Sequence, residues 1–76
     1  MKAKDIRIYD IDTEELIGRS FDVHFDIQYT RMAESTQTLR FDNERVDLVQ
    51  IRSILNDDIH LYGLYKGLMV SIHITI

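Results

Sequence analysis

The chain has 76 residues, with 13 acidic and nine basic side chains, a net charge of −4 and no cysteine. This length leaves room for one core, so we expect a single domain over residues 1–76. The absence of cysteine excludes disulfides, thiolate metal sites and thiol catalysis, and it favours a reducing compartment. A negative charge disfavours unspecific attraction to phosphate or anionic lipid, so we expect neither direct nucleic-acid binding nor membrane attachment.

Targeting signals are not evident in the sequence. Residues 1–5 contain two lysines, but no apolar stretch of the kind found in secretory leaders follows them. The longest apolar-rich stretch, residues 68–76, is about half the length of a membrane span and is interrupted by Ser71, His73 and Thr75. We therefore expect a soluble, cytoplasmic protein.

The N-terminal part predicts a hairpin. Residues 6–11 read as a strand, residues 12–15 supply turn-forming side chains, and an extended segment restarts at Leu16. Pairing Ile11 with Leu16 would place Tyr9 opposite Gly18 and Ile6 opposite Phe21. The apolar face then changes near Gly18, so we expect a β-bulge at Gly18-Arg19.

Residues 20–30 carry the clearest strand signal. Apolar residues occupy every second position, as expected for a strand with one buried and one solvated face: Phe21, Val23, Phe25, Ile27 and Tyr29. A third strand over residues 36–41, after a loop at residues 30–36, would place Leu39 opposite Ile27 and Phe41 opposite Phe25.

A change of period after Arg45 predicts a helix over residues 47–55. Asp47 and Gln50 have the spacing of a capping box, and the polar run of residues 56–58 would end the helix. The apolar residues fall at helical spacing and would form one stripe: Leu48, Val49, Ile51, Ile54 and Leu55.

The last part predicts a second hairpin with Lys66-Gly67 as a two-residue turn. In this register Leu61 pairs with Ile72 and Ile59 with Ile74 on one face. On the other face, Leu64 pairs with Met69, Tyr62 with Ser71 and His60 with His73. We therefore expect an α+β fold, in the order strand, strand, strand, helix, strand, strand, with the helix on one face of an antiparallel sheet of about five strands.

Two groups of residues have the chemistry of metal ligands. Asp22, His24 and Asp26 alternate along the polar face of one strand, and His60 and His73 form a cross-strand pair. A solvated strand face and a packed surface contact explain the same patterns, so we expect no metal and no cofactor. The His60 and His73 pair also allows repulsion between protonated rings in acid.

Two surfaces offer contacts to another protein. Tyr62, Leu64 and Met69 lie beside His60 and His73 on the outer face of the last hairpin, and we expect Tyr9 to join them. An acidic contact loop is formed by Asp10, Asp12, Glu14 and Glu15. The strand also runs to the final residue, so as a sheet edge it would accept an added strand.

These features favour a non-enzymatic interaction module, a small inhibitor or an accessory subunit that binds another protein or a second copy of the chain in a homo-oligomer. Small acidic proteins of this kind are often encoded by phages and other mobile elements. Two alternatives remain: a small-ligand or metal-binding domain, and an acidic mimic that blocks a nucleic-acid-binding enzyme. We expect no catalytic residues, because a water-excluding site with its supporting shell is hard to build around so small a core.

Overall fold

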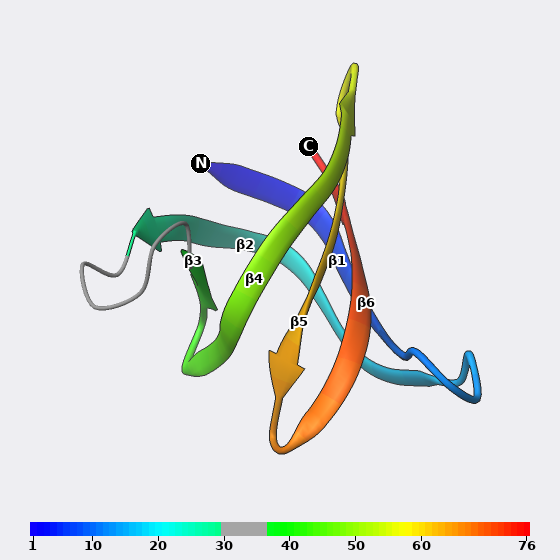
Figure 1. Cartoon of the computed structure of the whole chain (residues 1–76). Coiled ribbons are helices and arrows are strands. Elements are labelled where there is room, and N and C mark those ends of the chain that lie inside the picture. Colours follow the sequence, from blue (N-terminus) through cyan, green and yellow to red (C-terminus); the bar gives the residue numbers. More distant parts are fainter. Residues whose placement is uncertain (30–36) are drawn as a thin grey trace.

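The computed structural model describes residues 1–29 and 37–76, which form six antiparallel strands closed into a barrel (Figure 1). The strands are β1 (Lys2–Asp10), β2 (Leu16–Tyr29), β3 (Gln37–Phe41), β4 (Glu44–Leu55), β5 (Asp58–Tyr65) and β6 (Leu68–Thr75). Each strand pairs with the next one along the chain, and β6 returns to pair with β1. The loop expected at residues 30–36 lies outside the described residues.

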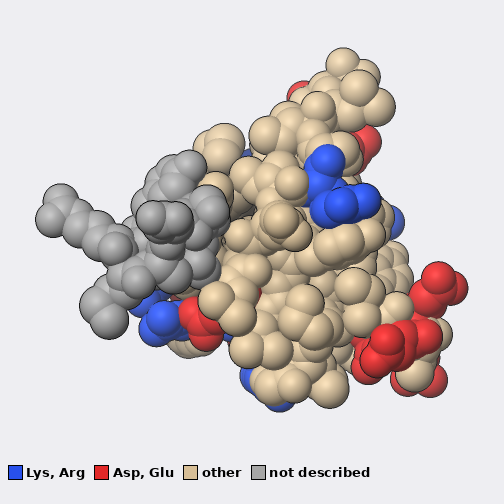
Figure 2. Space-filling model, in the orientation of Figure 1, with Lys and Arg blue, Asp and Glu red and all other residues tan. Residues whose placement is uncertain are grey.

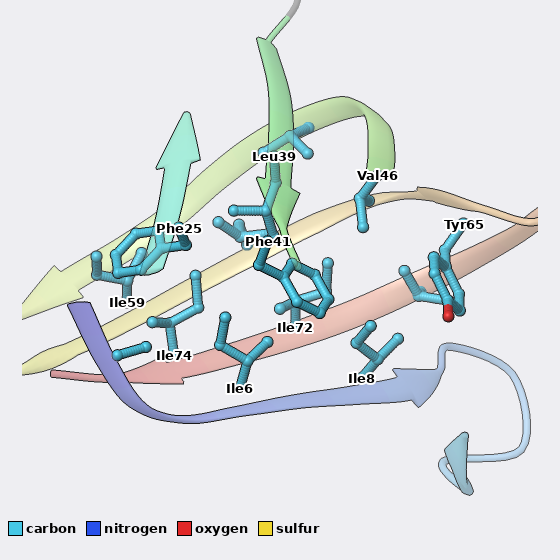
Figure 3. Close-up of a cluster of buried hydrophobic side chains, with 14 of the residues drawn as sticks. Ile6, Ile8, Phe25, Leu39, Phe41, Val46, Ile59, Tyr65, Ile72 and Ile74 are labelled. Atoms are coloured by element: carbon cyan, nitrogen blue, oxygen red, sulfur yellow. The ribbon is translucent and has the colours of Figure 1, made fainter. Parts of the chain in front are cut away.

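The barrel is filled by side chains from every strand (Figure 3). Ile6 and Ile8 of β1, Leu39 of β3 and Ile72 of β6 are almost completely buried, and they point toward one another in the centre. Completely burying such a side chain contributes roughly 1.5–3 kcal/mol, so this cluster is the main source of stability.

The last hairpin has the predicted register throughout. Leu61 pairs with Ile72 and Ile59 with Ile74 on the buried face, and His60 pairs with His73 on the other. Lys66 and Gly67 both have positive φ angles, 49° and 82°, which suits a two-residue turn between right-twisted strands. The predicted pairing of β2 with β3 is also confirmed, with Ile27 opposite Leu39 and Phe25 opposite Phe41.

The predicted α+β fold is wrong, because residues 47–55 belong to β4 and the described residues contain no helix. Leu48 has a φ of 52° and lies at an irregularity in the pairing of β4, which places Val46 and Val49 in the core three positions apart. A bulged strand therefore imitates the spacing of a helix. The Asp47 carboxylate accepts a hydrogen bond from Arg45 Nε at 2.7 Å and caps no helix.

The predicted register of the first hairpin is wrong, by one residue at Ile6 and by two residues at Tyr9. Tyr9 pairs with Leu16, Ile8 with Gly18 and Ile6 with Ser20, with the irregularity at Ile17 instead of Gly18-Arg19. A second departure from regular geometry occurs at Asp22, whose φ is 50°. As a result Phe21 is 61% exposed, although the alternation predicted that it would be buried with Val23 and Phe25.

Strand β6 is hydrogen-bonded to β5 on one side and to β1 on the other. The main-chain N–H of Ile76 also donates to the Asp57 carbonyl oxygen at 2.7 Å. The C-terminal strand is therefore an internal strand of the barrel, so the expected addition of a partner strand to it is not available.

Candidate functional site

The outer face of β1, β5 and β6 carries a cluster of aromatic and imidazole rings. Side chains in β5 and β6 alternate between the core and this face, so His60, Tyr62, Ser71 and His73 all point outward. The pairing of β1 with β6 adds Tyr9, which lies opposite Ser71. These five residues are half-buried, and we call them the ring cluster.

The rings contact each other in defined geometries. The His60 and His73 rings are stacked, with centroids 4.2 Å apart and an angle of 16° between their planes. Tyr9 meets His73 edge to face at 5.5 Å, and Tyr62 meets His60 edge to face at 5.3 Å. Aromatic pairs favour offset or edge-to-face arrangements of this kind, so each ring restrains its neighbour.

Polar contacts further restrain the two histidines. His60 Nε2 and Ser71 Oγ share a hydrogen bond of 2.8 Å. Burial lowers the pKa of His73 below its ordinary value, and the neighbouring His60 and Arg7 lower it further, whereas Asp58 acts in the opposite direction. These surroundings therefore favour the neutral form of the His73 ring.

A charged border lies on the β1 and β2 side of His73. Arg7 pairs with His73 across the strands, and its Nε is 3.2 Å from Asp5 Oδ2 in a geometry that forms no hydrogen bond. The same Asp5 carboxylate accepts two hydrogen bonds from Arg19, at 3.0 and 3.1 Å. Two arginines and one carboxylate therefore lie together at this end of the ring cluster.

The opposite end of the cluster opens into a pocket of about 410 Å³ beneath the β1–β2 turn. It is lined by aromatic, imidazole and acidic side chains: Tyr9, Asp10, Ile11, Glu14, His60, Tyr62, Ser71 and His73. A second hollow of about 290 Å³, which includes Arg7 and Asp58, lies against the same two histidines. The histidine stack is therefore a wall shared by two hollows, one with an acidic rim and one with mixed charge.

The acidic loop is held in place by its own first residue. Asp10 Oδ1 accepts hydrogen bonds from the main-chain N–H groups of Asp12 at 2.8 Å and Thr13 at 3.1 Å. Acidic side chains gather at this corner, at the lower right of the space-filling view (Figure 2). The carboxylates of the turn are thus held beside the pocket by main-chain hydrogen bonds.

The structure brings together four of the six predicted contact residues: His60, Tyr62, His73 and Tyr9. Leu64 and Met69 pair with each other farther along the same face and do not line the pocket. Of the acidic loop, Asp10 and Glu14 line the pocket, whereas Asp12 and Glu15 do not. Sequence reasoning did not assign a site role to Ser71 or Arg7, although the hairpin register already placed Ser71 opposite Tyr62.

The candidate metal ligands do not converge. Stacked, nearly parallel rings do not aim their nitrogens at one point, and His60 Nε2 is already bonded to Ser71. Asp22, His24 and Asp26 lie on a strand bent at Asp22, and Asp26 accepts a hydrogen bond from Gln28. Among the residues that the structure describes, no group of three or more histidines and carboxylates is arranged to hold a metal ion.

The hydrogen-bonded Ser71 and His60 have the separation of a nucleophile and a base. A working pair also needs a group that orients the imidazole and donors for the developing oxyanion. Among the hydrogen bonds of residues 1–29 and 37–76, none joins a carboxylate to His60. In the described residues, Ser71 and His60 are therefore a pair without an orienting carboxylate.

Neither a protein-family model, nor a curated protein, nor a solved structure matches this chain. In the described part of the chain, no helix has the length and apolar character needed to cross a membrane. The geometry of the ring cluster and its pocket is therefore the basis for the functional inference.

Proposed function

We propose that the protein is a non-enzymatic interaction module, a small inhibitor or accessory subunit, that binds another protein through the ring cluster and its acidic pocket. The observation that supports this most is the half-buried set of Tyr9, His60, Tyr62 and His73 beside the carboxylates of Asp10 and Glu14. Tyrosine is enriched at protein interfaces, where it provides a large apolar surface with a polar tip.

The composition of the pocket favours a basic side chain of the partner. Tyr9 and Tyr62 contribute aromatic rings, and Asp10 and Glu14 contribute negative charge. The Arg52 guanidinium of the same chain already lies over the Tyr62 ring, 5.1 Å from its centroid, so a cation can be held at this aromatic surface. A guanidinium or ammonium group over an aromatic face gains about 0.5–2 kcal/mol, and Arg in particular stacks on rings while bonding to carboxylates. The net charge of −4 assists the encounter with a basic partner.

The ring cluster is already ordered before a partner arrives. The edge-to-face contacts of His73 with Tyr9 and of His60 with Tyr62 limit the rotation of these side chains. Ordering a free side chain at an interface costs roughly 0.5–1.5 kcal/mol, so rings that are fixed in advance lose less on binding. Preorganisation thus supports recognition by a small surface.

The two alternatives fit the geometry less well. The densest acidic group, that of the acidic loop, lies at one turn and is not spaced along a face, as a mimic of a phosphate backbone would require. The histidine rings are stacked and do not converge on one point. We place the proposed interaction in the cytoplasm, because a chain without cysteine suits a reducing compartment.

The proposal is tested by titrating the ¹⁵N-labelled protein with N-acetyl-arginine amide and, in parallel, with the isosteric but neutral N-acetyl-citrulline amide. The arginine compound should shift resonances of Tyr9, Glu14, His60 and Tyr62 with a dissociation constant of about 1–10 mM, as expected for a single side chain. Citrulline should cause much smaller shifts.

The variant Tyr62→Ala should weaken the arginine shifts, and Leu48→Asn, on an exposed part of β4 outside the pocket, should leave them unchanged. Equal shifts with arginine and citrulline, or shifts that map away from the pocket, would contradict the proposal.

A further inference from the structure

Strand β4 has two halves with different surroundings. Residues 44–49 are paired with β3 on one side, and the last of these pairs joins Gln37 to Val49. From Gln50 to Leu55, within the described residues, β4 pairs only with β5. This outer half projects from the body of the barrel at the top of Figure 1, and its other edge presents main-chain N–H and C=O groups that no strand of residues 1–29 or 37–76 pairs with.

The outer half of β4 is also apolar where it is exposed. Ile51, Ile54 and Leu55 are 36%, 64% and 70% exposed. The pairing shifts by one residue at Arg52, so Ile51 lies opposite Leu61 and Ile54 opposite Ile59. Both isoleucines therefore lie on the core-facing side of the sheet, although no neighbouring layer in the described structure covers them.

Edge strands of native proteins are usually protected by charges, by proline or by a covering element. Residues 50–55 carry one charge, that of Arg52, and no proline. Because the free groups of an edge are main-chain donors and acceptors in an extended segment, another extended strand satisfies them best. The occupant is therefore a strand and not a helix or a lipid surface.

We propose that this edge pairs with the same edge of a second copy of the chain, in an antiparallel and two-fold symmetric arrangement. A two-fold axis between Arg52 and Ser53 pairs Ile51 with Ile54 of the second copy and Gln50 with Leu55 of the second copy. Each of these pairs joins side chains of the same face, because Ile51 and Ile54 face the core side and Gln50 and Leu55 the outer side.

Three features favour a second copy over another strand. In each copy the irregularity of β4 is at Arg52, directly beside the axis. The order of core-side and outer-side residues is therefore the same in both directions from the axis, and side chains of the same face meet on both sides of it. Arg52 lies opposite Ser53 of the second copy, so the two cations do not face each other directly. The acidic β1–β2 turn lies at the end of the molecule away from the β4–β5 tip, so it adds nothing to the repulsion between the copies from Asp57 and Asp58 at the tip (Figure 1).

The size of the interface sets the expected affinity. Six residues from each copy bury less than the roughly 800 Å² per partner of a standard interface. We therefore expect a reversible dimer with a dissociation constant on the order of 10–100 μM.

Sedimentation equilibrium between about 10 μM and 1 mM tests the proposal. The wild type should pass from monomer to dimer as its concentration rises. Ile54→Lys should stay monomeric, because each copy would place a lysine opposite Ile51 of the other copy. Leu68→Lys, a matched change of an exposed apolar residue outside β4, should dimerise like the wild type. Amide NMR spectra establish that both variants are folded.

A monomeric wild type at 1 mM would overturn the proposal, as would an Ile54→Lys variant that dimerises normally. If Tyr62→Ala lost dimerisation and Ile54→Lys kept it, self-association would belong to the ring cluster. That result would also overturn the proposed pairing of β4 edges.

The register has its own test, because the chain has no cysteine and accepts a single spin label. In the dimer, the Cα atoms of the two labelled Gln50→Cys residues should be about 17 Å apart. Gln50 of one copy lies opposite Leu55 of the other copy, and five residues of strand separate that Leu55 from the second label. An undetectable dipolar coupling at 1 mM would contradict the antiparallel arrangement.

Discussion

The β5–β6 hairpin and the outer half of β4 are neighbours in one sheet, yet they differ in almost every respect. The hairpin alternates without interruption, and its inward residues Leu61 and Ile72 are completely buried. The outer half of β4 contains an irregularity at Arg52 and leaves Ile54 exposed although it faces the core side. An apolar residue on the inner face of a strand thus stabilises the fold only where another layer covers it.

The same substitution in the two regions should have very different effects. Ile72→Ala creates a cavity in the centre of the barrel and should lower the free energy of unfolding by about 3–4 kcal/mol. Ile54→Ala should change it by less than about 0.5 kcal/mol, because this side chain is mostly exposed. Urea denaturation at a concentration below dimerisation measures both, and similar losses would refute the contrast.

The packing of the hairpin against the other half of β4, residues 44–49, depends on Gly63. A Cβ atom at this position would lie 2.5 Å from Val46 Cγ1 and 3.1 Å from the Asp47 carbonyl oxygen. Gly63→Ala should therefore cost about 1–3 kcal/mol through overpacking. Adding Val46→Ala should recover part of this loss in a double-mutant cycle. Strict additivity of the two variants would show that the crowding at Val46 is not the cause.

The ring cluster should make stability depend on pH. Because the pKa of His73 in the folded protein lies below its ordinary value, the unfolded chain binds a proton more readily. Stability from this group is present above the ordinary pKa of about 6.5 and is lost as the pH falls below it. His73 faces His60 and Arg7, which oppose its protonation, and Asp58, which favours it.

The variant His73→Gln should therefore flatten the decline in unfolding free energy between pH 7 and pH 5. His24→Gln, which replaces an exposed histidine outside the ring cluster, serves as the control and should keep the wild-type decline. Denaturation series at several pH values compare the three proteins. A decline of wild-type steepness in His73→Gln would contradict this account of the histidine stack.

The smallest effect is expected at Leu48, where the backbone has a φ of 52° and the side chain is 56% exposed. Asparagine adopts this left-handed region more readily than leucine, so Leu48→Asn should stabilise the fold by about 0.5 kcal/mol. Leu48→Ala should give no gain, because alanine meets the same backbone restriction. A destabilised Leu48→Asn would show that the leucine side chain makes a contact of its own.

Local rules were sufficient wherever the chain alternates regularly between tight turns. The Lys66-Gly67 turn and the alternation on both sides of it fix the register of β5 and β6, and with it the pairing of His60 with His73 and of Tyr62 with Ser71. The match of apolar faces likewise predicted the pairing of β2 with β3.

Local rules failed where long-range contacts decide the backbone. The irregularity at Leu48 places Val46 and Val49 against Gly63, a contact that the sequence around Leu48 does not show. The apolar spacing that results imitates a helix. Closure of the barrel joins β1 to β6, segments at opposite ends of the chain, so the site could be predicted only in part. That pairing brings Tyr9 and the acidic turn to the histidines.

Capture of a protein partner tests the proposed function most directly. Immobilised wild type and the variants Tyr62→Asp and Leu48→Asn would be exposed to a lysate of the host organism, and retained proteins quantified by mass spectrometry. We predict a partner that is retained by the wild type and by Leu48→Asn, lost with Tyr62→Asp, and cross-linked to Tyr9, Glu14 or Tyr62 through a basic segment. Retention that is unaffected by Tyr62→Asp, or no protein retained above that variant, would contradict the proposal.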